Sequence, residues 1–161
     1  MIFNDFLKFI PKIAKENLIG EKAHQKMSPP ERLKFINESD PSKFNPRKAA
    51  VLMLFYPKNK ETHLVLIVRN AYPGVHSSQI GFPGGKVEVF DINLEATALR
   101  ETYEEIGVAP HQVSIIKAFS ELYIPPSNFV VFPFLGVSYE ELIFKPDPLE
   151  VFGIIELSLK E

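Results

Sequence analysis

The sequence contains no cysteine among its 161 residues. This absence excludes disulfide bonds, thiol catalysis and zinc sites built on cysteine. An excess of basic residues is missing too: the formal net charge is −2, which gives no general attraction to nucleic acid or to an anionic membrane. Proteins without disulfides are typical of a reducing compartment, so we expect a cytoplasmic protein.

Long apolar runs are also missing. No stretch is long enough to span a bilayer, and the N-terminus lacks the basic-then-apolar order of a secretory leader. We find no internal repeat, low-complexity tract or linker to a second domain. The length and the 45% hydrophobic content suit one domain with a single core. We therefore expect one domain over residues 1–161, in which residues 1–48 form an N-terminal extension.

The N-terminal extension predicts a helix followed by a loop. Apolar residues recur at helical spacing after Asn4 or Asp5, and Pro11 predicts a kink or break. We expect this helix to pack on the domain or on a partner subunit. Residues 21–48 are polar and proline-rich, which predicts a loop with one short helix at 31–37.

The remainder predicts a strand-rich domain around one long helix. Five strands are expected, at 49–56, 63–69, 113–119, 129–137 and 154–159. Pro57 is expected to end the first strand, before a hairpin turn at 58–61. His63 has no partner at metal-ligand spacing, and we expect it to be exposed. The phenylalanines of 129–137 are expected mostly in the core rather than in base stacking.

The long helix lies in the second half of residues 84–108. Asp91 or Asn93 can cap its start, and Gly107 stands where a helix stop belongs. The helix carries three carboxylates at spacings that place them on adjacent faces: Glu101, Glu104 and Glu105. Like charges at this spacing destabilise a helix, and a hard divalent cation relieves the repulsion because it prefers oxygen ligands. A solvated acidic face without a ligand is the alternative.

Residues 84–108 resemble the Nudix box, whose pattern is G-x5-E-x7-R-E-U-x-E-E-x-G-U with U an apolar residue. The matching residues are Gly85, Arg100, Glu101, Glu104, Glu105, Gly107 and Val108. Asp91 stands where the pattern has Glu, the gap to Arg100 is eight residues instead of seven, and Thr102 takes an apolar position. The longer gap that starts with Asp resembles the coenzyme A pyrophosphatase branch of the family.

The loop before the box is similar to the upstream signature of that branch, R-S-x3-R-x3-G-x3-F-P-G-G. Arg69 and the run from Phe82 to Gly85 match it, while Asn70, Gly74 and Ser78 replace Ser, Arg and Gly. The replaced arginine removes a cation that could hold a phosphate-rich substrate. Arg69 ends a strand, from which it could reach a phosphate or form a surface ion pair.

The resemblance implies an α/β fold, a Nudix-type α/β/α sandwich with a mixed sheet. It also implies a Mg²⁺- or Mn²⁺-dependent hydrolase of a nucleoside diphosphate linked to another group. Coenzyme A or a derivative is the leading substrate, giving 3′,5′-ADP and 4′-phosphopantetheine. The alternatives are ADP-ribose, NADH or nucleoside triphosphates as substrates, and a non-catalytic module that senses a nucleotide.

The resemblance also implies roles for single residues. The metal ligands would be Glu101, Glu105, Glu104 and the carbonyl of Gly85. Arg100 would orient a carboxylate of the box, with Asp91 as its partner. Glu121 is the candidate general base, because it follows a strand and precedes the proline loop at 124–128. The candidate substrate-binding residues are Arg69, His76, Gly84 and Gly85; for His76 a structural role in the loop is the alternative.

Domains of this type usually add a C-terminal helix over the second face of the sheet, and no such helix is visible in the sequence. We therefore expect either a truncated chain, or cover of that face by the N-terminal helix or by a partner subunit. Dimerisation is common in the family, so a homodimer is one expected assembly.

Overall fold

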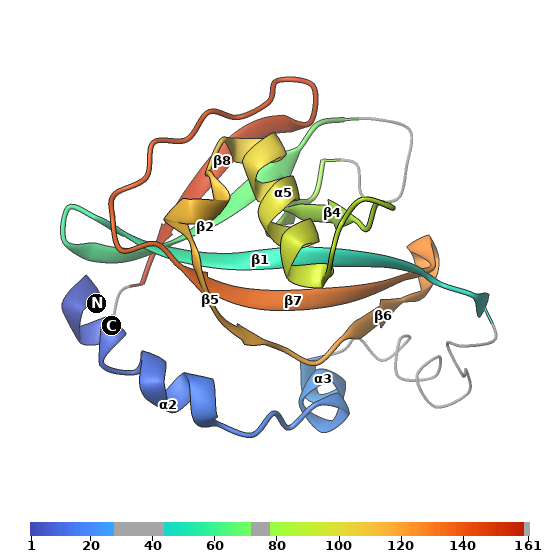
Figure 1. The fold of residues 1–161 in the computed structure, drawn as a ribbon, viewed down its shortest axis with the longest axis horizontal. Helices are drawn as coiled ribbons and strands as arrows, with labels where there is room; N and C mark the ends of the chain where they lie inside the picture. The colour runs from blue at the N-terminus through green and yellow to red at the C-terminus, as the bar shows by residue number, and fades with distance from the viewer. Residues whose placement is uncertain (28–43, 72–77, 160–161) are drawn as a thin grey trace.

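The structure is a computed structural model, and it describes residues 1–27, 44–71 and 78–159. Eight strands form one mixed sheet with the order β3-β2-β1-β7-β5, in which β4 also pairs with β1, β6 with β7 and β8 with β2 (Figure 1). The central strands β1 and β7 run parallel, and the other pairs are antiparallel. The strands are β1 (Arg47–Lys58), β2 (Glu61–Arg69), β3 (Ile80–Gly81), β4 (Gly84–Lys86), β5 (Ser114–Ala118), β6 (Leu122–Ile124), β7 (Phe129–Val137) and β8 (Val151–Ser158).

Alternation along β1 divides the core between the two faces of the sheet. Residues Ala50, Leu52, Leu54 and Tyr56 are buried in one apolar cluster, which also contains Ala98 and Ile106 of helix α5 (Leu94–Ile106). The residues between them, Met53 and Phe55, belong to a second cluster on the opposite face. The domain is therefore a mixed sheet with helices on both faces.

The second cluster is covered by two N-terminal helices, α1 (Phe3–Leu7) and α2 (Ile10–Lys15). The break that Pro11 predicts is present, and the proline occupies the first turn of α2, where its missing N–H is tolerated. Phe3 and Phe6 are buried against β7. The amine of Met1 donates to the carbonyl of Leu159, so the two ends of the described chain lie together. Of the expected covers for this face, the N-terminal helix is the one observed.

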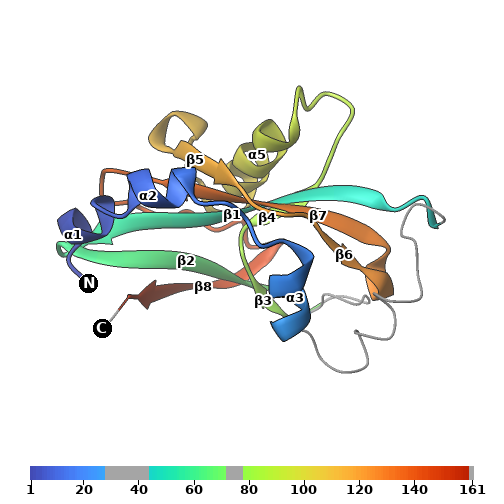
Figure 2. The same cartoon turned by 90° about the horizontal axis from the view of Figure 1, so that it is seen from below.

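Residues 21–27 correct the predicted loop, because they form helix α3 (Glu21–Met27). Their sequence, EKAHQKM, consists of good and moderate helix formers, and the prolines that suggested a loop begin only at position 29. Helices α3 and α5 lie on opposite sides of the central strands (Figure 2). The short helix expected at 31–37 lies outside the described residues.

The expected strands are present, with one boundary that differs for a clear reason. Strand β1 runs through Pro57 to Lys58. Pro57 lies opposite Thr62 of β2, and the pairing of β1 with β7 ends at Phe55 opposite Val137. The Thr62 N–H donates to the Met1 carbonyl, and the Thr62 carbonyl accepts from the Leu159 nitrogen, so neither group is paired with Pro57. No ladder hydrogen bond is therefore required from the proline nitrogen, and the strand tolerates it.

Three short strands were not expected from the sequence: β3, β4 and β6. In β4 the glycine pair itself forms ladder contacts, because Gly84 pairs with Val51 and Gly85 with Ala50. No helix among the described residues is long and apolar enough to cross a membrane.

Candidate active site

Helix α5 has a defined start and end. The side chain of Asn93 accepts a hydrogen bond from the Ala96 nitrogen at 2.8 Å, so Asn93 rather than Asp91 is the N-cap. Gly107 ends the helix with a φ of 75°, a left-handed conformation that favours glycine. These two ends fix the rotation of the helix and hence the directions of its glutamates.

Asp91 is the partner of Arg100, as predicted. The Arg100 Nε and Nη2 atoms donate to the two Asp91 oxygens, each at 2.8 Å. Asp91 also accepts from the Glu88 nitrogen and from the Thr97 hydroxyl, both at 2.9 Å. The Arg100 guanidinium holds the pKa of Asp91 well below its usual range. The shorter aspartate therefore still makes a two-point ion pair.

The same guanidinium joins two glutamates of the helix. Arg100 Nη1 donates to Glu101 Oε1 and to Glu104 Oε2, in both cases at 2.8 Å. A positive group thus lies between the two carboxylates and offsets the repulsion that their spacing predicts. Each glutamate keeps a second oxygen, Glu101 Oε2 or Glu104 Oε1, to which no residue in the described part of the chain donates a hydrogen bond.

Glu105 does not lie on a solvated acidic face, the alternative that the sequence left open, because its side chain is only 1% exposed. Its Oε1 accepts from Arg69 Nη1 at 2.9 Å, and its Oε2 accepts from the Gly84 nitrogen at 2.7 Å. Arg69 Nη2 donates in turn to the Gly84 carbonyl at 2.7 Å. The structure thus places Arg69 in a partly buried ion pair rather than a surface pair.

Burial has the largest influence on the pKa of the Glu105 carboxylate. It raises the pKa of Glu105 to about 7, although the Arg69 charge and the Gly84 N–H act in the opposite direction. Burial also raises the pKa of Glu101, against the effect of Arg100. Burial thus raises the pKa of two carboxylates on the same helix.

Both glycines of β4 are required by close contacts. Gly84 has a φ of 144°, and a Cβ there would collide with the backbone of β1. A Cβ on Gly85 would collide with the carboxylate of Glu101. The glycine pair thus allows the carboxylate to lie directly against the backbone of β4.

These donors fit a hard divalent cation in chemical type, because they are carboxylate oxygens beside a backbone strand. The free oxygens of Glu101 and Glu104 are the available donors. In the described residues no three histidine, aspartate or glutamate side chains are already gathered around one point. Both oxygens of Glu105 are occupied by Arg69 and Gly84. The site is therefore suited to a cation in its chemistry, and its carboxylates are held by arginines.

Two other candidate residues lie away from this cluster. Glu121 is exposed just before β6, and among the described contacts none joins it to helix α5. His76 lies outside the described residues. The roles of both stay predictions.

Glu150, by contrast, is a site residue that the sequence did not indicate. Its negative charge adds to burial in raising the pKa of Glu101 and of Glu105. The Asn70 nitrogen donates to its carbonyl at 2.9 Å, and the Asp147 nitrogen donates to the Glu105 carbonyl at 3.0 Å. These bonds fix the segment before β8 against the end of α5. No motif or periodicity links this segment to the helix.

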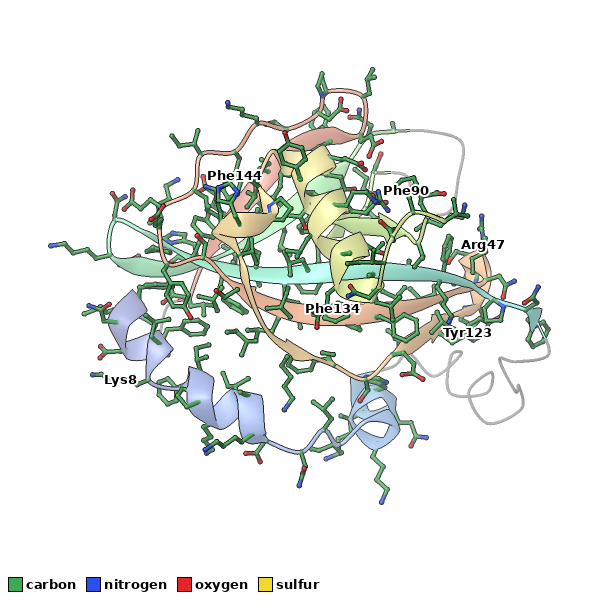
Figure 3. The ribbon with its side chains drawn as sticks, in the orientation of Figure 1. Lys8, Arg47, Phe90, Tyr123, Phe134 and Phe144 are labelled. Atoms are coloured by element: carbon green, nitrogen blue, oxygen red, sulfur yellow. The ribbon has the colours of Figure 1, made fainter. Side chains whose placement is uncertain are left out.

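A cavity of about 530 Å³ adjoins the glycine pair, and its lining includes Arg69, Gly84 and Gly85. Phe129 also lines it, with the Arg47 guanidinium carbon 4.2 Å from the centre of its ring. Figure 3 shows Arg47 and Tyr123 together at this end of the sheet, away from Phe134 in the core. Of the phenylalanines expected in the core, Phe134 is fully inside, whereas Phe129 faces the cavity.

The fold and the arginine-held carboxylates define a class of protein that comparison with known families identifies. Residues 46–160 match the family described as NUDIX domain, and the chain belongs to this family.

Two relatives show how far the likeness extends. The chain is 34% identical over 119 residues to Nudix hydrolase 22, chloroplastic, of Arabidopsis thaliana, covering 72% of this chain and 39% of that protein. It is 35% identical over 124 residues to a protein of Cronobacter sakazakii named Uncharacterized Nudix hydrolase NudL, covering 74% of this chain and 62% of that one. The chain thus spans less than two thirds of the length of these relatives.

Solved structures support the same fold at lower identity. A binary complex of the Caenorhabditis elegans Ap4A hydrolase superposes with a TM-score of 0.58 at 17% identity, over 70% of this chain and 80% of that one. The NUDIX domain of Shewanella oneidensis NrtR, complexed with ADP ribose, superposes with a TM-score of 0.56 at 17% identity, over 78% of this chain and 82% of that one.

Proposed function

We propose that this chain is a hydrolase of nucleoside diphosphate derivatives that depends on Mg²⁺ or Mn²⁺. The observation that carries the proposal is the convergence of Glu101 and Glu104 on one Arg100 nitrogen, beside the backbone of Gly85. Relatives with hydrolase names and the retained carboxylates support it. The retained carboxylates also favour an enzyme over a nucleotide sensor.

Each residue of the cluster has a role in this proposal. Glu101 and Glu104, through their free oxygens, and the Gly85 carbonyl would hold the ion, which when bound would polarise phosphate oxygens and lower the pKa of a water. Glu105 would join them by giving up its hydrogen bond to Arg69 or to Gly84. Arg100 fixes the directions of Glu101 and Glu104 through its two-point bond to Asp91. Arg69 neutralises Glu105 and aligns it with β4 through the Gly84 carbonyl. Gly84 and Gly85 allow substrate close to the backbone.

The general base has two candidates. Glu121 stays a candidate from its position before the proline loop. Glu150 is a second one, because its charge acts on both Glu101 and Glu105. A base must reach the attacking water, and only Glu150 has a described influence on this cluster.

Coenzyme A or a derivative is the leading substrate. The support is the eight-residue gap after Asp91, the run from Phe82 to Gly85, and the cavity beside it. ADP-ribose, NADH, dinucleotides and nucleoside triphosphates are the alternatives, and structural neighbours are named for Ap4A and ADP ribose.

A hydrolysis panel tests the proposal. The protein is incubated with Mg²⁺ or Mn²⁺ and, separately, coenzyme A, ADP-ribose, NADH and nucleoside triphosphates, and the products are separated by chromatography. We expect 3′,5′-ADP and 4′-phosphopantetheine from coenzyme A. Cleavage of another member alone would reject coenzyme A, and no cleavage by protein that still binds metal would favour the sensor.

A further inference from the structure

The cavity beside the glycine pair lies on the face of the sheet opposite helix α5. Ala49, Val51 and Met53 of β1 line it, and these residues alternate with those in the core under α5. On β7 the lining residues are Phe129, Val131 and Pro133, of which Val131 and Pro133 pair with Ala49 and Val51 in parallel register. The floor of the cavity is therefore an apolar surface of two central strands.

The walls are apolar as well, and they carry almost no charge. Phe82, Phe119 and Ile124 are among them. Among the described lining residues only Arg69 and Lys86 have permanently charged side chains. Arg69 is bound to Glu105, and Lys86 is half exposed and paired with Glu88 at 3.4 Å. Among the described lining residues, Lys86 is therefore the cation that can meet an anion, because its pair with Glu88 is long and exposed, whereas Arg69 is committed to Glu105.

Helix α3 contributes to this cavity from outside the family match, which begins at residue 46. His24 of α3 is a lining residue. The backbone just before α3 approaches the loop before β6: a Cβ on Gly20 would lie 3.6 Å from the Ser120 hydroxyl, and Ser120 also lines the cavity. The N-terminal segment is held in place by Lys117, whose Nζ donates to the Ile13 carbonyl at 2.9 Å. This part of the wall therefore comes from the segment that precedes the matched domain.

The geometry points to an orientation of the substrate: the cavity holds the neutral chain attached to the diphosphate, the phosphorylated nucleotide stays at the mouth, and helix α3 shapes the wall that contacts the chain. For coenzyme A the pantetheine arm lies inside and the 3′-phosphorylated adenosine outside. This inference rests on the proposed function, because it takes the diphosphate to lie at Gly85 and Glu101.

Charge decides between the two orientations. A phosphate monoester that enters the apolar interior without a cation loses its hydration and gains no ion pair in return. The pantetheine arm carries no charge, and its amides need only a few hydrogen-bonding groups. Ser120 and His24 are lining residues of that kind. At the mouth, Lys86 is half exposed and can approach a solvated phosphate.

Binding of substrate fragments to the metal-free full chain tests this orientation without requiring hydrolysis. The probes are pantetheine and adenosine 3′,5′-bisphosphate, titrated in a calorimeter. Ala49→Phe fills the floor of the cavity, and Lys26→Ala is the control, because Lys26 is exposed on the same helix as His24 and is not a lining residue. We expect pantetheine to bind, with affinity about tenfold or more weaker in Ala49→Phe and unchanged in Lys26→Ala.

Two results overturn the orientation: pantetheine does not bind or its affinity is unaffected by Ala49→Phe, or Ala49→Phe abolishes binding of the adenosine fragment instead. Ser120→Phe lies in a loop and fills the same space, so it replaces Ala49→Phe if that variant does not fold. Pantetheine binding by a protein that hydrolyses no member of the panel would reject the proposed function and leave the site for a neutral chain standing.

Steady-state kinetics of the active enzyme tests the role of helix α3. His24→Ala should raise KM for coenzyme A severalfold with kcat unchanged, and should leave KM for ADP-ribose unchanged, because ADP-ribose has no chain to contact the wall. Lys26→Ala should change none of these constants. An equal effect on both substrates, or an effect on kcat alone, would reject α3 as a wall that recognises the chain.

Discussion

Two arginine–carboxylate pairs anchor helix α5, and the pKa of the carboxylate is lowered in one pair and raised in the other. Arg100 binds Asp91 at two points, nine residues away, and the pKa of Asp91 falls. Arg69 binds Glu105, 36 residues away, and the pKa of Glu105 still rises to about 7. Asp91 receives four hydrogen bonds at its two oxygens, including both from Arg100. The Asp91 and Glu105 side chains are both almost inaccessible to water, at 3% and 1% exposed. Glu105 receives two hydrogen bonds where Asp91 receives four, so desolvation outweighs them at Glu105 alone.

Removal of Arg69 should have the largest effect on stability. Arg69→Ala leaves a buried carboxylate without its cation, and we expect a loss of about 3–5 kcal/mol in the free energy of unfolding at pH 8. Urea unfolding measures it. The double variant Arg69→Ala/Glu105→Gln should recover part of the loss, because the buried charge is gone. A loss below about 1 kcal/mol would show that the pair behaves as an exposed one.

The second largest effect should be the change of the free energy of unfolding with pH in the metal-free protein. The pKa of Glu105 is higher in the folded protein than in the unfolded chain. The protonated Glu105 carboxyl therefore contributes to folding stability fully below about pH 4.5, and this contribution is lost as the pH rises through 7. Urea unfolding in a chelator should give a free energy of unfolding that falls between pH 5 and pH 8 by up to about 3 kcal/mol. Glu105→Gln should flatten this slope. A stability that rises over the same range would contradict the raised pKa.

Arg100→Lys should have a smaller effect on stability, because a charge remains while the two-point bond to Asp91 is lost. We expect about 1–2 kcal/mol, measured by urea unfolding at pH 7. Lys58→Ala is the control, since its pair with Glu156 is largely exposed and should be worth well under about 1 kcal/mol. Equal losses in the two variants would show that the geometry around Arg100 has no special value.

The two candidate bases give the smallest expected effect. Glu150→Gln should lower kcat about tenfold or more without unfolding the protein, because Glu150 is exposed. Glu121→Gln is its matched partner, also exposed and before a strand. Steady-state kinetics with the substrate that the panel identifies would separate them. A tenfold loss in Glu121→Gln alone would return the role to Glu121.

The difference between the pairs also explains what the sequence could predict. The Asp91–Arg100 contact lies within one continuous motif, and the resemblance of that motif to the Nudix box predicts it, whereas the position of Gly107 after the helical pattern predicts the helix stop. The sequence placed Glu105 beside Glu101 and Glu104, either as a metal ligand or on a solvated acidic face, and neither interpretation predicted its burial. Its burial depends on Arg69 from a strand far away in the chain.

The other features that the sequence did not predict depend on contacts between distant residues or on segments too short to give a pattern. Strand β4 consists of three residues with two glycines, which give no strand signal by themselves. Glu150 reaches the site only through the fold of residues 147–150 against α5. Helix α3 precedes a proline-rich stretch, and the prediction extended the loop over residues 21–27 and placed its short helix at 31–37. Tertiary contacts determine the outcome for β4 and Glu150, whereas local propensity accounts for α3.

The central claim is that helix α5 holds a divalent ion, and a Mn²⁺ titration tests it most directly. The wild type, Glu101→Gln, Glu105→Gln and Glu95→Gln are compared by calorimetry at pH 8, where Glu95 is an exposed glutamate on the same helix. The account predicts saturable binding by the wild type and by Glu95→Gln, with binding at least tenfold weaker in the other two. Equal binding in all four variants, or no saturable binding in the wild type, would contradict it.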